Sequence, residues 1–189
     1  MSTRKPVPLL RPTILLLLLW CSACSTQLGA EQGDHSAAPR PPVSVAETPY
    51  YVEFRARPSV VTGHTYLVYG ALGQNGQPAD ENVVGFTPRG GILGLFVGMI
   101  AVPGEIGKDF LDEKLPDYNS YRRYLTSSEY QHLLAFIADE QKQTKVWNMF
   151  INNCNDFAAD AAQVIGLKVP FDRFVPPPLF VAMLSEMNT

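Results

Sequence analysis

Residues 50–87 decide the fold: they begin YYVEFRAR (Tyr50–Arg57), continue through HTYLVY (residues 64–69) and end NVVGFT (residues 82–87). The first segment alternates apolar and polar residues after Tyr50, which is typical of a half-buried strand. The second is rich in the aromatic and β-branched residues that strands favour, and the third is interpreted as its return strand. Turn-forming residues separate these two segments, namely Gly73, Asn75, Gly76 and Pro78. The pattern predicts an antiparallel meander.

Further along the chain the sequence predicts one more strand and then helices. Residues 118–125 (YNSYRRYL) are interpreted as the strand. Thr126 and Glu129 have the spacing of a capping box, and apolar residues at helical spacing follow, which predicts a helix to about residue 144. Residues 155–165 (NDFAADAAQVI) predict a second helix that Gly166 closes, and residues 179–187 a short terminal helix.

The N-terminus has the features of an export signal. Arg4, Lys5 and Arg11 form a basic region with no acidic residue before Glu31. The apolar run that follows, residues 13–20, is shorter than the roughly 20 residues a spanning helix needs, and it fits the apolar core of a secretory signal. The sequence therefore predicts a signal peptide over residues 1–23.

Cys21-Ser22-Ala23-Cys24 resembles a bacterial lipobox, in which small residues precede a cysteine that is lipidated and becomes the new N-terminus. The resemblance implies a lipid on Cys24 and anchoring to a membrane. Ser25 after it implies the outer membrane of a Gram-negative cell, facing the periplasm. An ordinary signal-peptidase cut after Ala23 is the alternative, and either processing exports the chain.

Composition divides the exported chain into a tether and one domain. Residues 24–48 are rich in Ser, Ala, Gly, Gln and Pro and lack aromatic residues, which indicates a flexible tether. Residues 49–189 remain as a single domain, which we expect to be monomeric. Removal of the signal lowers the basic residues from 15 to 12 against 18 acidic ones, so the charge does not favour binding to nucleic acid.

The segment from Gly90 to Gly104 (GGILGLFVGMIAVPG) is apolar but interrupted by glycines. It is too short and too rich in glycine to indicate a membrane span. The favoured interpretation is a buried strand or helix that packs against the sheet. A flap over a site and a patch that touches lipid remain alternatives.

Cys154 is the one cysteine inside the predicted domain. It stands where an Asn-Asn loop meets the predicted helix, and the N–H groups and dipole at a helix N-terminus stabilise a thiolate. Asp156 and Asp160 act in the opposite direction. These residues alone leave a nucleophile and a buried structural thiol as open alternatives.

A thiol nucleophile needs a base within hydrogen-bond reach. His35 lies in the tether, and His132 is expected on the solvated face of a helix. His64 follows a glycine at the start of a predicted strand, where a side chain can emerge at the edge of the sheet, so it is the candidate base.

Other polar residues are candidates for orienting the imidazole or for binding an oxyanion. If the two strands pair around the Asn75-Gly76 turn, Thr87 lies nearly opposite His64, and Asn82 is a second candidate. Asn148 and Asn153 are candidate oxyanion donors, although asparagines near loops are more often turn formers.

Known motifs for other chemistry are missing from the sequence. The predicted domain contains no HExxH, CxxC, P-loop, GxGxxG helix start or GxSxG elbow, so neither a metal nor an organic cofactor is expected. The paired carboxylates Asp112-Glu113 and Asp139-Glu140 are more typical of surface charge than of glycosidase acids.

Two elements together resemble a known superfamily. Gly63-His64-Thr65-Tyr66 comes early, and Asn152-Asn153-Cys154-Asn155-Asp156-Phe157 comes late, followed by Ile165-Gly166-Leu167 and Pro170. They resemble the permuted papain-like families, which include PPPDE-type peptidases, the lecithin–retinol acyltransferase group and bacterial relatives of the NlpC type. The histidine precedes the cysteine, and Asn153 and Phe157 match the pattern around it. Asp156 stands where PPPDE-type members often have histidine, so the substrate stays open.

The resemblance implies a circularly permuted, papain-like α+β fold over about residues 50–170, with an antiparallel sheet that carries His64 and a helix that carries Cys154. It implies a thiol hydrolase without a cofactor that cleaves an amide bond, and the expected location makes a cell-wall peptide or an envelope protein the expected substrate. An acyltransferase or esterase acting on lipid is the close alternative. A non-catalytic envelope binding protein is the alternative from another class.

Overall fold

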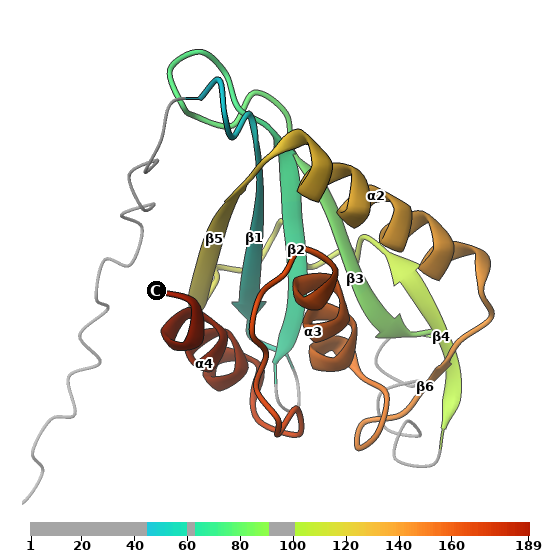
Figure 1. Ribbon diagram of the computed structural model, residues 1–189. Coiled ribbons are helices and arrows are strands. Elements are labelled where there is room, and N and C mark those ends of the chain that lie inside the picture. Colours follow the sequence, from blue (N-terminus) through green and yellow to red (C-terminus); the bar gives the residue numbers. More distant parts are fainter. Residues whose placement is uncertain (1–44, 60–62, 91–100) are drawn as a thin grey trace, which may run out of the picture. The chain divides into compact units, whose positions relative to one another are not determined.

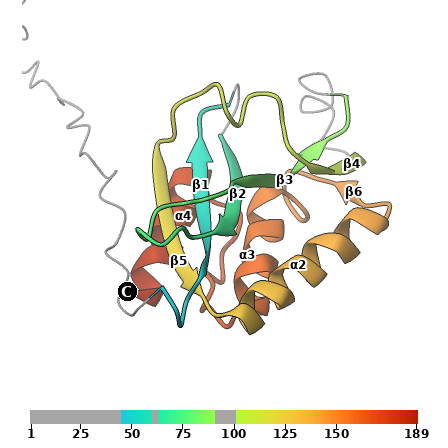
Figure 2. The same cartoon turned by 90° about the horizontal axis from the view of Figure 1, so that it is seen from above.

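A six-stranded antiparallel sheet with three helices on one face makes up the described part of the protein, residues 45–59, 63–90 and 101–189 of a computed structural model (Figures 1 and 2). The strand order is β5-β1-β2-β3-β4-β6. The strands are β1 (Tyr50–Arg57), β2 (His64–Ala71), β3 (Asn82–Pro88), β4 (Val102–Gly107), β5 (Asn119–Leu125) and β6 (Val146–Trp147). The helices are α2 (Ser127–Lys142), α3 (Cys154–Val164) and α4 (Pro177–Asn188). The fold class is therefore α+β.

The meander forms as its residue pattern predicts. Arg57 pairs with His64 across β1 and β2, and Tyr66 pairs with Gly85 across β2 and β3. Gly76, in the turn between β2 and β3, has a φ of 74°, a left-handed conformation that glycine adopts without strain.

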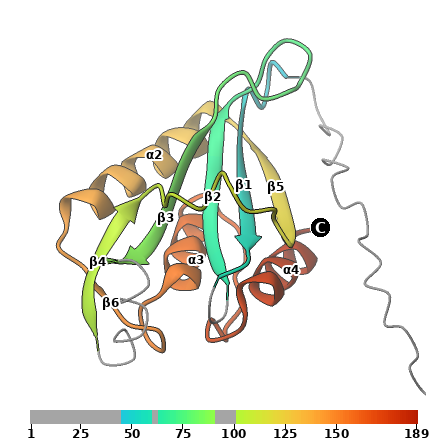
Figure 3. The same ribbon diagram turned by 180° about the vertical axis from the view of Figure 1, so that it is seen from behind.

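Alternation along the strands gives the sheet two different faces. The face under the helices carries the larger apolar cluster, which includes Phe54, Leu67 and Phe86. The other face carries a smaller cluster around Tyr66, and the segment between β4 and β5 crosses it (Figure 3).

The predicted helices are confirmed, with shifted ends. Thr126 caps α2 and forms the predicted capping box with Glu129. The second helix begins at Cys154, one residue before the predicted start, and Gly166 follows it with a φ of 79°. The terminal helix α4 begins at Pro177, because proline is well accommodated in the first turn of a helix.

Strand β4 begins with the last three residues of the segment Gly90–Gly104, and these are not buried; the strand as a whole was not predicted, since Pro103 and Gly104 interrupt any strand pattern there. Most of the apolar segment that starts at Gly90 lies outside the described residues, so its interpretation as core, flap or lipid contact stays a prediction. The signal peptide, the lipidated Cys24 and most of the tether also lie outside them. Within the described residues no helix is both long and apolar enough to cross a membrane.

Candidate functional site

Helix α3 is capped so that Cys154 becomes its first residue. The Oδ1 atom of Asn153 accepts hydrogen bonds from the backbone N–H groups of Asn155 (2.8 Å) and Asp156 (3.4 Å). In return, the carboxylate of Asp156 accepts from the Asn153 N–H (2.9 Å). This reciprocal capping box satisfies the free N–H groups of the first turn and holds the Cys154 side chain at the helix N-terminus.

The thiol of Cys154 is buried, with 8% of the residue exposed. Burial raises the pKa of this thiol, because a thiolate loses its hydration there. Hydrogen bonds from the backbone N–H groups of Thr65, Asn155 and Cys154 itself act on the pKa in the opposite direction. The net shift is upward, so Cys154 rests as a neutral thiol at neutral pH.

Asn155 joins the start of α3 to strand β2 and to the segment before α4. Thr65 Oγ1 donates a 2.6 Å hydrogen bond to Asn155 Oδ1. Asn155 Nδ2 donates to the backbone carbonyls of Arg173 and Val175, both at 2.9 Å. Thr65 and Asn155, which directly follow His64 and Cys154, are therefore joined by a hydrogen bond.

His64 is the first residue of β2, and its imidazole is buried over Gly85. A methyl group on Gly85 would lie 2.7 Å from His64 Nε2, so only glycine leaves room for the ring. Nε2 has no hydrogen-bond partner among the described residues, and it lies 3.8 Å from Asp112 Oδ1. Burial, reinforced by the positive charge of Arg57, lowers the pKa of His64 to about 3. The imidazole is therefore neutral in the resting protein, and its surroundings disfavour the protonated form.

Asp112 belongs to a buried ion-pair cluster behind His64. Its Oδ1 accepts a 2.7 Å hydrogen bond from Arg57 Nε, and its Oδ2 accepts from the Asp109 N–H at 2.9 Å. Arg57 also pairs with Asp109, at 3.0 Å. Burial raises the pKa of Asp112, while Arg57 acts to lower it. The interpretation of Asp112 as surface charge was wrong, because Asp112 is buried and forms an ion pair with Arg57 from strand β1.

The other three members of the two carboxylate pairs lie outside the cavity described next. Glu113 is exposed and pairs with Lys108. Asp139 pairs with Lys142 and Glu140 with Lys145, all at or just beyond the end of α2.

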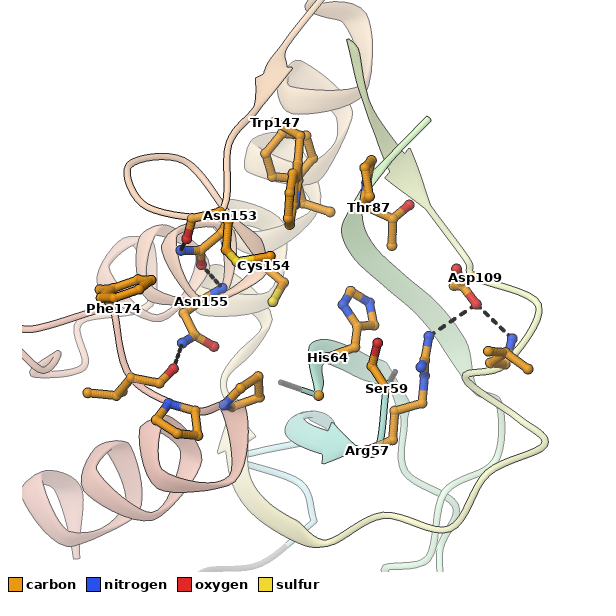
Figure 4. A pocket seen from close by; sticks show the side chains of 18 of the residues that line it. Arg57, Ser59, His64, Thr87, Asp109, Trp147, Asn153, Cys154, Asn155 and Phe174 are labelled. Carbon is orange, nitrogen blue, oxygen red and sulfur yellow. Dashed lines mark hydrogen bonds and ion pairs between the residues drawn. The ribbon is translucent and has the colours of Figure 1, made fainter. Parts of the chain in front are cut away.

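Cys154 and His64 line the same cavity, which has a volume of about 530 Å³. Their side chains face into it from α3 and β2 at one end of the sheet (Figure 4). Most of the other lining residues are apolar: Phe86, Phe110, Leu111, Trp147, Met149, Phe174, Val175 and three prolines. A nucleophile and a base on the wall of a mostly apolar cavity are a typical arrangement for a ligand site.

Two of the four predicted orienting and oxyanion residues line the cavity, and two do not. Thr87 lines the cavity, and the register of β2 and β3 extends to place it opposite His64, as predicted. Asn153 also lines the cavity, but its amide is committed to the helix cap and to the Met149 carbonyl. Asn82 pairs with Tyr69 at the other end of β3, so it does not reach the site.

Asn148 does not line the cavity either. Its Oδ1 accepts a hydrogen bond from the Phe150 N–H (2.9 Å), and its backbone bridges Asn152, so it forms a turn. His132 is exposed on α2, as expected.

Three residues of the site were missed. Arg57 could have been found from the sequence, because the connection between the two predicted strands is short and such a hairpin pairs Arg57 with His64. Gly85 carried a weaker signal, as a glycine inside a predicted strand often marks close approach. Asp112 had none, because it comes from the loop after β4. No group of three metal-ligating side chains occurs in the part of the chain that the structure describes.

A comparison with models of known protein families, with curated proteins and with solved structures gives no match for this chain.

Proposed function

We propose that the protein is a thiol hydrolase of the bacterial cell envelope that cleaves an amide bond, with Cys154 as nucleophile and His64 as base. The observation that carries the proposal is that Cys154, at the N-terminus of α3, and His64, at the start of β2, line one cavity. The order of these elements, a histidine strand before a cysteine helix, supports assigning the fold to the permuted papain-like group. The envelope location rests on the N-terminal export signal.

The reaction starts from a neutral pair. Burial holds the pKa of the Cys154 thiol above its usual value and that of the His64 imidazole below it. As the sulfur attacks the acyl carbon, His64 takes the thiol proton, and it then gives this proton to the leaving amine. A water molecule releases the acyl group through the same base and regenerates the thiol. The backbone N–H of Cys154, which the capping box does not engage, is suited to stabilise the oxyanion.

Asp112 has the position of the group that orients the imidazole. Its carboxylate lies on the Nε2 side of the ring, 3.8 Å away, and is itself fixed by Arg57. A carboxylate there stabilises the imidazolium that forms during attack. The positive charge of Arg57 opposes the imidazolium, so His64 is neutral in the resting protein.

A non-catalytic binding protein is the second candidate. Two observations favour it: Cys154 and His64 are both buried, and no hydrogen bond joins them in the described structure. In that function the cavity holds a ligand and Cys154 serves as a small apolar residue.

Acylation of Cys154 by a small activated ester separates the two functions. The full chain is incubated with p-nitrophenyl acetate, and acyl-Cys154 is measured by mass spectrometry together with nitrophenol release. We expect acylation of Cys154 that falls at least about 100-fold in His64→Gln, the range that a general base contributes. His132→Gln, on the exposed face of α2, is the matched control and should equal wild type. Equal rates in wild type and His64→Gln would support the binding protein.

A further inference from the structure

We propose that the indole N–H of Trp147 is a second donor to the oxyanion that forms when Cys154 attacks a carbonyl carbon. This inference rests on the proposed thiol hydrolase function and adds a catalytic residue to it. It depends on three features of the structure: the unpaired state of the Trp147 N–H, its place beside the start of α3, and the commitment of the other nitrogen donors in the cavity.

The Trp147 N–H is buried without a hydrogen-bond partner. Trp147 is 4% exposed, and its Nε1 atom finds no acceptor in the part of the chain that the structure describes. An indole nitrogen can only donate, and a buried donor left unpaired costs about 1–3 kcal/mol. The Nε2 atom of His64 is also unpaired, and both residues line the same cavity. Unpaired buried groups that gather on one cavity are explained when a ligand supplies the missing partner.

A short hairpin holds Trp147 beside the start of α3. Trp147 ends β6, and the backbone of the next residue, Asn148, exchanges hydrogen bonds of 2.9 and 3.1 Å with that of Asn152. This is an antiparallel bridge, so the residues just outside it, Trp147 and Asn153, lie across from one another. Both of these residues line the cavity, and Asn153 directly precedes Cys154. Trp147 is therefore held next to the residue whose thiol attacks.

The other side-chain nitrogens that line the cavity are committed elsewhere. The amide nitrogens of Asn153 and Asn155 donate to backbone carbonyls. The guanidinium of Arg57 is paired with Asp109 at 3.0 Å, and it lies at the opposite end of the cavity from Trp147 (Figure 4). Because the remaining nitrogen group is the imidazole assigned as the base, the Trp147 N–H is the free nitrogen donor of the described wall.

A second donor suits the charge that develops during the reaction. In the attack a bond forms between Cys154 Sγ and the carbonyl carbon, and the π electron pair of the carbonyl moves to its oxygen. The thiol proton passes to His64 and leaves with the amine when the tetrahedral intermediate collapses. Until then the oxygen is negative, in a cavity that is mostly apolar and whose one arginine is already paired. Fixed N–H groups in such surroundings, here those of Cys154 and Trp147, stabilise an oxyanion strongly.

Removal of this one N–H group tests the inference on the full chain. Trp147→3-benzothienylalanine replaces the ring N–H by sulfur and keeps the shape of the side chain. We expect kcat for Cys154 acylation by p-nitrophenyl acetate to fall about 100-fold with little change in KM, because this bond strengthens only in the transition state. The free energy of unfolding should not fall, since no native hydrogen bond is lost. Tyr69→Phe, which removes a polar atom from an aromatic side chain at the other end of the β2–β3 pair, is the matched control and should equal wild type.

Exchange of sulfur for oxygen in the substrate separates a catalytic role from a structural one. The p-nitrophenyl thionoester of acetic acid carries C=S in place of C=O, and sulfur is a weak hydrogen-bond acceptor. The oxygen ester gains from the Trp147 N–H and the thionoester does not, so the benzothienyl variant should lower the ratio of the two rates at least about tenfold. Trp147→Phe, which also lacks the N–H, should lower it similarly. A displaced cavity wall would slow both substrates alike and leave the ratio at the wild-type value.

Wild-type protein supplies a measurement that does not require a variant at position 147 to fold. Propanal adds to Cys154 as a hemithioacetal, whose oxygen takes the place of the oxyanion. A ¹³C label at the aldehyde carbon reports the adduct by NMR. The indole proton resonance of Trp147 should move downfield in this adduct, because it gains an acceptor, and should not move when propanal is added to Cys154→Ala.

The outcomes separate this inference from the proposed function. A wild-type ratio in both Trp147 variants, or an indole resonance that does not move in the adduct, would overturn the inference while acylation that depends on His64 leaves the thiol hydrolase intact. A ratio that falls in Thr87→Val and not in Trp147→Phe would assign the donor to Thr87 and also overturn it. Failure of the oxygen ester to acylate Cys154 in wild type would overturn both.

Discussion

Thr65 and Asn155 are joined by a buried 2.6 Å hydrogen bond that couples strand β2 to helix α3. Each residue directly follows one member of the candidate dyad, His64 or Cys154. Asn155 also holds the backbone of the segment that leads into α4, through the Arg173 and Val175 carbonyls. The relative position of thiol and imidazole is therefore set by side chains that do not react.

Removal of this hydrogen bond should affect both stability and reactivity. Thr65→Val keeps the shape of the side chain but leaves Asn155 Oδ1 buried without its donor, which should lower the free energy of unfolding by about 1–3 kcal/mol. Acylation of Cys154 should slow as well, because the dyad loses its spacing. Urea unfolding and p-nitrophenyl acetate acylation measure the two effects. Asn82→Ala, at an exposed position away from the site, is the control and should change neither the free energy of unfolding nor the acylation rate. A wild-type acylation rate in Thr65→Val would contradict the role of this hydrogen bond in positioning His64 and Cys154.

Gly85→Ala should displace the imidazole of His64. The added methyl group would lie 2.7 Å from Nε2, closer than two such atoms can approach. A misplacement of about 1 Å in a catalytic group costs on the order of 100-fold in rate, so we expect a loss of this size in Cys154 acylation. Gly107→Ala is the matched control, since Gly107 pairs with Gly85 across β3 and β4 and has no atom within 4 Å of the new methyl group. Similar activity in both variants would rule out this position for the imidazole.

Asp112→Asn tests the carboxylate behind His64. The substitution preserves shape but removes the charge that pairs with Arg57 and faces Nε2. We expect a rate loss of at least about tenfold in acylation, because the imidazolium loses its stabilising charge. The free energy of unfolding should fall by about 1.5–3 kcal/mol, the range for a hydrogen bond to a charged group. Asp139→Asn, an exposed carboxylate paired with Lys142, controls for loss of charge alone. A variant that is destabilised yet fully active would assign Asp112 a purely structural role.

Stability should depend on pH through His64. Its pKa of about 3 in the folded protein lies below the value of about 6.5 in an unfolded chain. Between these values the unfolded chain binds a proton that the folded protein excludes, so His64 makes stability fall as pH falls through this window. The contribution approaches about 1.4 kcal/mol per pH unit.

Urea unfolding of wild type and His64→Gln at pH 4, 5, 6 and 7 isolates this contribution, because other titrating groups are common to both. The stability of wild type should decline more steeply below pH 6 than that of His64→Gln. His132→Gln should follow wild type. Parallel curves for wild type and His64→Gln would mean that His64 is not buried in its neutral form.

The local elements follow directly from the sequence. Alternation in Tyr50–Arg57 and the turn residues around Gly76 specify a hairpin meander, and the register then puts Thr87 opposite His64. The capping box at Thr126 and Glu129 specifies where α2 begins. These features depend on residues a few positions apart, so the interactions that decide them are present in the local sequence.

Strands β4 and β6 were not predicted because they are stabilised by their neighbours more than by their own residues. Strand β4 contains Pro103 and Gly104, which disfavour strand structure, and β6 has two residues. Each forms by pairing along the edge of a sheet that the meander has already built. Such pairing is invisible to a local pattern.

The sequence by itself determined that Cys154 stands next to the start of a helix and that His64 opens a strand, since caps, turns and apolar periodicity are short-range properties. Only the tertiary structure decided that the two residues share a cavity and that this cavity is apolar. It also decided that Asp112 is buried against Arg57 and that Gly85 lies under the imidazole. The physical reason is that burial, charge pairing and close approach arise between residues far apart in the chain, and these interactions set the protonation states of the thiol and the imidazole.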